Sequence, residues 1–198
     1  MADYITTDEF KARHNITATG DTGIIAECVT EASRMVDGLT GRRYDADTAA
    51  TARVYAPVDD YVVWIDDAWS ITSVATDTAD DGTYGTAWAA SDYQVWPMNG
   101  VGPNMVSGWP TTRLMAIESR VFPSHRRPSV QVTAKWGWAA VPADIKGAVY
   151  LLANRLFEER KTPFGTVGSA DFGAMAIRDQ RTVLRMLAPF MRREPVVA

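Results

Sequence analysis

The residues that could carry catalysis are few and stand apart. The chain of 198 residues has two histidines, His14 and His125, and one cysteine, Cys28. Neither histidine has a second His, Cys or Glu at metal-ligand spacing, and no serine-nucleophile, zinc-protease, paired-cysteine or phosphate-loop motif is present. An enzyme needs such a constellation. We therefore predict a protein that is not an enzyme, with no catalytic residue, no cofactor and no metal.

Two loops contain residue types that are common in ligand-binding loops. Residues 77–82 combine aspartates with a glycine, but the spacing of a calcium loop is not met and no glutamate follows. We predict a hairpin turn there. Residues 163–173 are glycine-rich but lack the lysine and the preceding strand of a phosphate loop. We interpret this segment as a linker or a contact loop.

The seven tryptophans are a second set of residues that could bind a ligand, because indole faces can stack on sugars or bases. Trp64 lies in an apolar stretch, and Trp136 alternates with Val132 and Val130, so we favour core or interface positions for most of them. Trp109, in a long loop, is expected to be exposed. The alternative of a β-rich receptor- or carbohydrate-binding module stays open. It would use Trp64, Trp88, Trp96 or Trp109.

Charge is unevenly spread along the chain. The net charge is −4, yet residues 141–198 hold nine Lys or Arg against six Asp or Glu. A basic end on an acidic body favours oriented contact with an acidic partner surface, although a solvated helix face is equally compatible. It does not indicate a dedicated nucleic-acid binder. The predicted partner-binding residues are those of the basic stripe and the tail after Pro189: Arg178, Arg181, Arg185, Phe190, Arg192 and Arg193.

A strand-to-helix joint over 130–161 supplies the clearest structural signal. Residues 130–136 alternate apolar and polar side chains, the pattern of a half-buried strand. Gly137 permits a backbone turn, and Pro142 suits the first turn of a helix that runs to Lys161. The residues predicted to pack in the core or between subunits are Trp136, Trp138, Leu152 and Leu156.

The spacing of apolar residues divides the rest of the chain into helices and strands. Thr6 or Thr7 is predicted to cap a helix to about His14, and Asp21 to cap a second helix that ends at Gly41. Its buried face is predicted to contain Ile25, Cys28, Val29, Ala32, Met35, Val36 and Leu39. Short strands are predicted at 53–56, 61–65, 71–76, 83–87, 93–96, 113–117 and 130–136, and a last helix at 179–187.

This order predicts an α+β fold. A helical bundle framework would carry a β-rich, sandwich- or barrel-like insertion between the second and third helices. The predicted domains are residues 1–49, 50–137 and 138–198. No run of about 20 apolar residues predicts a membrane span, and the polar N-terminal stretch is not typical of a secretory signal.

Several short motifs together resemble the head-tail connector (adaptor) proteins of tailed bacteriophages, over nearly the full chain. They are Tyr4-Ile5-Thr6, Leu39-Thr40-Gly41-Arg42, Val132-Thr133-Ala134-Lys135-Trp136-Gly137-Trp138, Val141-Pro142-Ala143-Asp144-Ile145-Lys146-Gly147-Ala148, Phe164-Gly165 and Leu187-Ala188-Pro189-Phe190-Met191-Arg192-Arg193.

The resemblance implies a structural virion protein in the neck, assembled in the host cytoplasm. Such a protein forms a ring of about 12 copies below the portal and extends the DNA channel. It also provides the platform for stopper or tail-completion proteins. The implied partners are other copies of the chain, the portal, the stopper, and double-stranded DNA passing through the lumen without sequence-specific binding. No membrane is expected. A heterologous interface repeated around an axis closes into such a ring.

Overall fold

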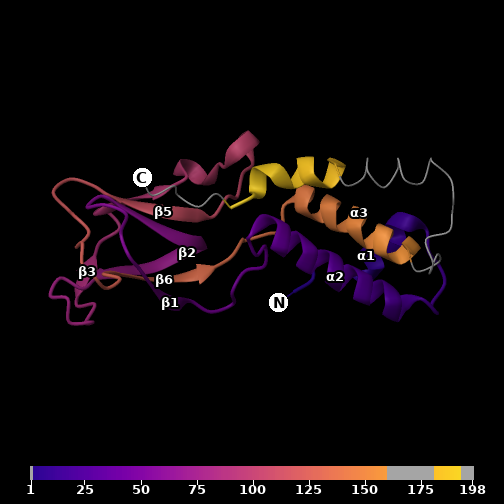
Figure 1. Cartoon of the computed structure of the whole chain (residues 1–198), viewed down its shortest axis with the longest axis horizontal. Helices are drawn as coiled ribbons and strands as arrows, with labels where there is room; N and C mark the ends of the chain where they lie inside the picture. Colours follow the sequence, from indigo (N-terminus) through magenta and orange to yellow (C-terminus); the bar gives the residue numbers. More distant parts are fainter. Residues whose placement is uncertain (1, 160–180, 193–198) are drawn as a thin grey trace. The chain divides into compact units, whose positions relative to one another are not determined.

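The computed structural model describes residues 2–159 and 181–192. The chain combines helices with an antiparallel sheet, as expected for an α+β protein (Figure 1). It divides into two compact units, which we call the helical unit (Met1–Tyr44 with Val141–Arg193) and the sheet unit, whose described part is Asp45–Ala140.

The first two helices begin and end at the residues that the sequence marks. α1 (Thr7–His14) starts with a capping box, in which the Thr6 hydroxyl accepts from the Glu9 N–H and the Glu9 carboxylate accepts from the Thr6 N–H. α2 (Thr22–Thr40) ends at Gly41, whose φ of 64° is the left-handed conformation that glycine adopts without strain. Asp21 takes the N-cap position of α2 but forms no side-chain cap hydrogen bond.

α3 (Ala143–Glu159) packs against α2. Residues 181–187 form a further helical segment, followed by the 3-10 turn η3 (Ala188–Phe190). A Cβ at Gly147 would lie 2.5 Å from Cε of Met186, so the glycine lets this segment approach α3 closely. The fully buried apolar side chains of the helices are Phe10, Ile25, Val29, Ala32, Val36, Ile145, Ala148, Val149, Ala153, Leu187 and Phe190.

The buried face of α2 is narrower than predicted. Ile25, Val29 and Val36 are buried, but Met35 and Leu39 are 41% and 43% exposed. The apolar positions of α2 span more of its circumference than α3 covers. In the last helical segment, Val183 and Leu187 are buried whereas Leu184 is 40% exposed.

Six strands form one antiparallel sheet in the order β1-β6-β2-β5-β4, and β3 pairs with the far end of β2. Since β1 and β4 end this order, the described strands form neither a closed barrel nor two separate sheets. The strands are β1 (Thr51–Tyr55), β2 (Val62–Thr76), β3 (Thr86–Trp88), β4 (Tyr93–Trp96), β5 (Thr111–Ala116) and β6 (Val130–Trp136).

β2 is a single strand of 15 residues, where the sequence predicted two strands separated by Asp66 and Asp67. The register shifts around these aspartates, so β2 pairs with β5 through its first half and with β6 through its second. Their carboxylates also have partners: Asp66 accepts from Arg53 at 2.8 Å, and Asp67 accepts from the Trp138 indole at 3.2 Å. These contacts keep the strand continuous where isolated aspartates would favour a turn.

The core of the sheet unit lies on one face of the strands. β6 alternates as predicted, with Val130, Val132, Ala134 and Trp136 buried. They belong to one cluster with Val63, Ile65, Ala68, Val74, Trp88, Leu114 and Phe122. Because both halves of β2 contribute to this cluster, the bulged strand curves around a single core.

The long loop before β5 is compact. The prediction that Trp109 is exposed was wrong. Trp109 retains 7% of its accessible surface and packs edge-on against Trp138, with ring centroids 4.8 Å apart. A Cβ at Gly102 would lie 2.1 Å from Cε3 of Trp109, so only glycine leaves room for the indole. The loop is also folded by the 3-10 turns η1 (Met98–Gly100) and η2 (Pro103–Met105).

Candidate functional site

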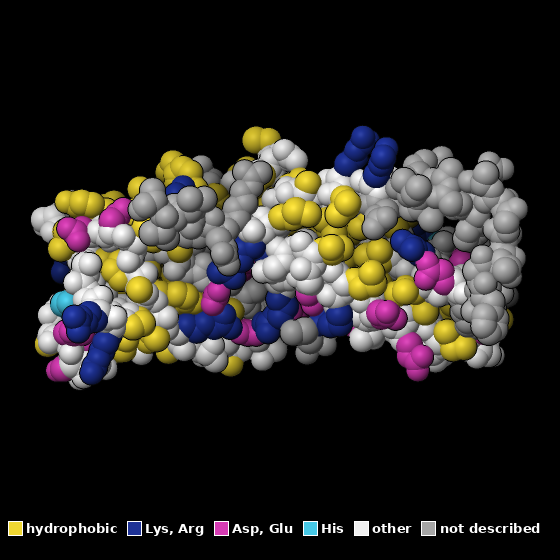
Figure 2. Space-filling view, in the orientation of Figure 1, with side chains coloured by type: hydrophobic (Ala, Val, Ile, Leu, Met, Phe, Trp, Pro, Cys, Tyr) yellow, Lys and Arg dark blue, Asp and Glu magenta, His cyan; other side chains and the backbone are white. Residues whose placement is uncertain are grey.

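An apolar groove with a volume of about 370 Å³ lies on the surface of the helical unit. Its walls come from α2 and from residues 181–187, and α3 contributes the floor. Hydrophobic side chains are visible over these helices in Figure 2. The groove is lined by Met35, Gly38, Leu39, Leu151, Leu152, Arg155, Val183 and Leu184.

One wall of the groove continues into an exposed stripe of α2, which we call the acidic stripe: Ile24, Glu27, Glu31 and Met35. Their spacing of three and four residues places them on one side of the helix. All four are exposed. Glu27 and Glu31 form no ion pair or hydrogen bond with the described residues. The stripe is therefore apolar at its ends and negatively charged between them.

The opposite wall presents what we call the basic ridge: Arg181, Leu184 and Arg185. These residues lie on the exposed side of the helical segment, at a spacing of three and one. Arg181 and Arg185 have no acidic partner among the described residues. Arg155 lies at the floor of the groove and is already paired with Glu159 at 2.7 Å. The two glutamates and the two arginines do not line the groove itself, but they lie on the two helical segments that form its walls.

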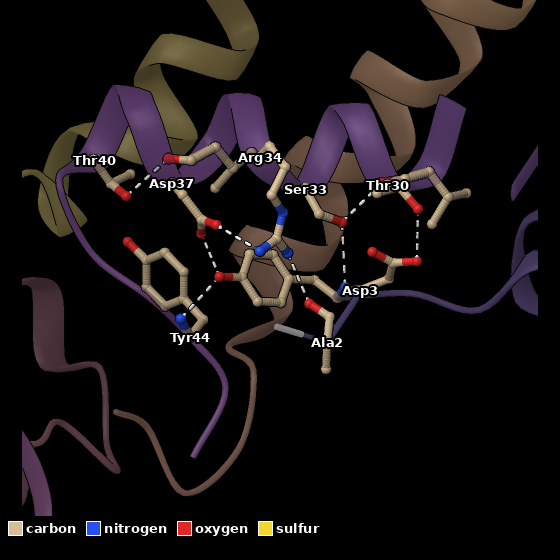
Figure 3. A network of polar contacts seen from close by, with 11 residues as sticks. Ala2, Asp3, Thr30, Ser33, Arg34, Asp37, Thr40 and Tyr44 are labelled. Atoms are coloured by element: carbon tan, nitrogen blue, oxygen red, sulfur yellow. Dashed lines mark hydrogen bonds and ion pairs between the residues drawn. The ribbon is translucent and has the colours of Figure 1, made fainter. Parts of the chain in front are cut away.

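A polar network fastens the N-terminal residues to α2 (Figure 3). The Tyr4 hydroxyl donates to the Asp37 carboxylate and accepts from the Tyr44 N–H at 3.0 Å. Arg34 pairs with Asp37 at 3.2 Å and donates to the Ala2 carbonyl at 2.7 Å. Burial, followed by the hydrogen bond to Asp37, raises the pKa of Tyr4. The Tyr4 hydroxyl therefore stays protonated. It links the N-terminal residues to Asp37 of α2 and to Tyr44, which follows α2.

The chain after the last helical segment is held against α2. The Arg192 N–H donates to the Thr40 carbonyl at 2.8 Å. Phe190 is fully buried, and its ring lies edge-on to Tyr44 at 6.1 Å. Residues 188–192 are therefore an anchored end of the helical unit, whereas the sequence suggested a tail released by Pro189.

The predicted partner-binding residues are placed differently from one another. Arg181 and Arg185 are exposed on the basic ridge, and Arg192 is also exposed. Phe190 belongs to the core of the helical unit, because burial against Tyr44 leaves it no free surface. Arg178 and Arg193 lie outside the described residues.

The four predicted packing residues also separate into two groups. Trp136 and Trp138 are each 1% exposed, and their indole N–H groups donate to the Thr51 carbonyl and to Asp67. Leu152 is buried at the floor of the groove, and Leu156 is half-buried. The tryptophans thus pack within the sheet unit, while Leu152 lies next to open surface.

The sheet unit exposes a second feature, formed by one arginine and two tryptophans. The Arg113 guanidinium lies 5.2 Å from the Trp64 ring centroid and 4.5 Å from that of Trp96. The strand pairing explains the contact, because Arg113 is opposite Trp64 on one neighbour and Trp96 on the other. One face of each indole is therefore covered by the cation. Trp88 is buried and stacks on Phe122.

No group of three or more His, Cys, Asp or Glu side chains able to hold a metal ion occurs in the described residues. Burial, then Arg13, lowers the pKa of His14, which lies against Phe10. Asp77 uses its carboxylate to accept from the N–H groups of Ala79 and Gly82, at 3.1 and 2.8 Å, and so closes the predicted turn.

Among the helices described, none is long and apolar enough to cross a membrane.

Sequence reasoning missed Glu27 and Glu31 as candidate site residues. Their i, i+4 spacing between Ile24 and Met35 was the available signal. The Arg113 contacts had no such signal, because the register between strands decides which side chains meet. The wall formed by residues 181–187 likewise depends on how this segment packs on α3.

Comparison with known proteins gives a match at the level of the fold. No protein-family model matches the chain, and no curated protein matches it in sequence. The fold is similar to that of a chain in the neck of an empty gene transfer agent (GTA) particle solved with C6 symmetry. The TM-score is 0.55 at 16% identity, over 98% of this chain and 92% of that one.

Two further structures give the same result. A chain of the virion of the native GTA particle matches with a TM-score of 0.55 at 16% identity, over 98% of this chain and 94% of that one. A chain in the neck of the native GTA particle, solved with C12 symmetry, has a TM-score of 0.52 at 16% identity, over 96% and 90%. The chain therefore shares its fold with components of this virus-like particle.

Proposed function

We propose that this protein is a structural component of a virion neck, a head-to-tail adaptor. It forms a ring below the portal, extends the DNA channel and offers a docking platform to stopper or tail-completion proteins. The ring contains about 12 copies. Double-stranded DNA passes through its lumen without sequence-specific recognition. We propose no enzymatic activity, and assembly takes place in the host cytoplasm.

One observation carries the proposal: the fold matches a neck chain of a gene transfer agent particle over 98% of this chain. A match of that extent includes both units, so it concerns the whole architecture. The six- and twelve-fold symmetry with which those necks were solved supports a ring. We further propose that the helical unit is the framework that the connector proteins share, and that the sheet unit is an elaboration set between its second and third helices.

The surface of the helical unit supports an assembly role. Met35, Leu39 and Leu184 are each about 40% exposed around one groove. A contiguous apolar patch beside charged residues is typical of a protein–protein contact. We propose that the basic C-terminal region faces acidic protein surfaces of the assembly, the portal among them.

The experiment is a mass measurement by light scattering, on the protein alone and mixed with its cognate portal protein. Twelve copies of the 21.7 kDa chain give about 260 kDa. A ring of this mass, alone or on the portal, and a ring-shaped image by negative stain are expected. A protein that stays monomeric in both conditions contradicts the proposal.

The second candidate is a receptor- or carbohydrate-binding virion module. The half-buried Trp64 and Trp96 are the observation in its favour. Arg113 occupies one face of each ring, and Trp88 and Trp109 are buried, so less indole surface is free than a stacking site needs. Binding to a glycan array by a monomeric protein would support this candidate over the adaptor.

A further inference from the structure

We propose that the acidic stripe of α2 in one copy docks on the basic ridge of the next copy. The two walls of the groove are then the two halves of one repeating contact. The proposal deepens the adaptor function and rests on it, since it names the surface through which copies of this chain meet.

Charge complementarity is the first argument. Glu27 and Glu31 are exposed without a cationic partner among the described residues, and Arg181 and Arg185 are exposed without an acidic one. The stripe carries two negative charges one helical turn apart, and the ridge carries two positive charges at the same i, i+4 spacing. Two antiparallel or parallel helices can therefore bring both pairs together.

Apolar side chains are interleaved with these charges on each surface. Ile24 and Met35 flank the glutamates and are 38% and 41% exposed, while Leu184 lies between the arginines and is 40% exposed. Burying these side chains supplies the non-directional part of the binding energy. The charge pairs then fix the register and exclude wrong pairings.

The charge pattern restricts the symmetry of the contact. Contacts of stripe with stripe, or of ridge with ridge, place like charges together, and like charges repel. In a two-fold dimer the stripe of each copy would meet the ridge of the other at one reciprocal interface, and light scattering separates such a dimer from a ring by its mass. When the stripe and the ridge meet two different neighbours, the contact is heterologous, and it generates a closed ring or an open chain. Because stripe and ridge belong to opposite walls around α3, each copy can contact two neighbours at the same time.

The test is a charge-reversal series measured by light scattering and negative stain. Glu27→Lys with Glu31→Lys, and separately Arg181→Glu with Arg185→Glu, are expected to weaken ring formation at least about tenfold. Combining all four reversals is expected to restore it. The matched controls are Glu118→Lys and Arg126→Glu, which are expected to leave the ring unchanged. Both residues are exposed charges of the sheet unit that form no ion pair or hydrogen bond with the described residues.

A cross-linking measurement keeps the test informative if a reversed variant folds poorly. A copy with Glu31→Cys is mixed under mild oxidation with a copy carrying Arg185→Cys, the pair expected for parallel helices, or Arg181→Cys, the pair expected for antiparallel helices. A disulfide-linked dimer that depends on both new cysteines is expected, because Cys28 is buried. Absence of this dimer from a ring-forming mixture overturns the proposal, as does a wild-type ring that the reversals leave intact.

The outcomes separate this inference from the proposed function. A ring that tolerates the reversals leaves the adaptor function standing and overturns the stripe–ridge contact. Reversals that abolish portal binding while the ring persists also overturn it, and assign the arginines to the portal instead. A chain that forms no ring alone or with portal contradicts both.

Discussion

The carbonyl oxygen of Asp45 lies 1.9 Å from the position that a Cβ would occupy at Gly137. Gly137 also has a φ of 100°, which side chains rarely adopt, and its N–H donates to the Asp67 carbonyl at 2.7 Å. This glycine therefore serves both the turn after β6 and the close passage of the chain that leads into β1.

Replacing Gly137 by alanine should be strongly destabilising, since both the backbone angle and the Asp45 carbonyl oppose a side chain. We expect a loss of about 2–4 kcal/mol and a fall in melting temperature of roughly 5–10 °C. Gly85→Ala is the matched control, because a Cβ there meets nothing within 4 Å. Equal melting temperatures for the two variants would show that the backbone at Asp45 and Gly137 shifts to accept a side chain without a loss of stability.

Tyr4→Phe should destabilise the helical unit by about 1–3 kcal/mol. The change removes the hydroxyl that donates to Asp37 and accepts from the Tyr44 N–H, leaving buried polar groups with fewer partners. Chemical denaturation followed by circular dichroism measures the loss. Tyr61→Phe is the control, because Tyr61 is 55% exposed. A loss no greater than that of the control would assign no energetic role to the network.

Asp77 should make stability depend on acid pH. Burial on its own raises the pKa of this carboxyl, but backbone N–H donors led by Gly82 outweigh it and hold the pKa below the usual value. The stabilisation is therefore present above the pKa of the unfolded chain, and it is lost as the pH falls through the lower pKa of the folded chain.

The measurement is thermal unfolding of the wild type and of Asp77→Asn from pH 6 to pH 2. The wild type should be more stable at pH 6, and the difference should shrink once the pH falls below about 4. Asp60→Asn, at an exposed residue, should show no such trend. A difference that persists unchanged at pH 2 would mean that the charge of Asp77 contributes nothing.

Arg113→Ala should uncover the indole faces of Trp64 and Trp96. We expect a loss of about 1–2 kcal/mol from the two cation–π contacts and a red shift of tryptophan emission as water reaches the rings. Lys135→Ala, which removes a longer contact of 5.5 Å to the exposed Trp69, should have a smaller effect. If the sugar-binding candidate were right, the Arg113 variant should bind glycans more tightly than the wild type.

The sequence predicted best where a local rule and the tertiary environment agree. The bounds of β6 follow from strict alternation, and the start of α1 follows from a capping threonine, which was predicted at Thr6 or Thr7 and lies at Thr6. Both signals are complete within seven residues. The end of α2 at Gly41 is equally local, because the left-handed backbone after a helix selects glycine.

The errors arise where a contact between distant residues overrides the local signal. Asp66 and Asp67 predicted a break in β2, but Arg53 and Trp138 provide partners for their carboxylates. Trp109 was predicted to be exposed, yet the space above Gly102 holds its ring. The groove could not be predicted for the same reason. The spacing of apolar residues shows that Met35 and Leu39 lie on an apolar face of α2, but it does not show how much of that face α3 covers.

The pairing of β1 with β6 has a consequence for how this protein can change. The Asp47 N–H donates to the Trp136 carbonyl at 2.8 Å, and β1 pairs with β6, so the chain enters and leaves the sheet unit at neighbouring positions. Its two ends are thus adjacent, like the stem of a hairpin. A module built this way can be lengthened, trimmed or exchanged as a cassette.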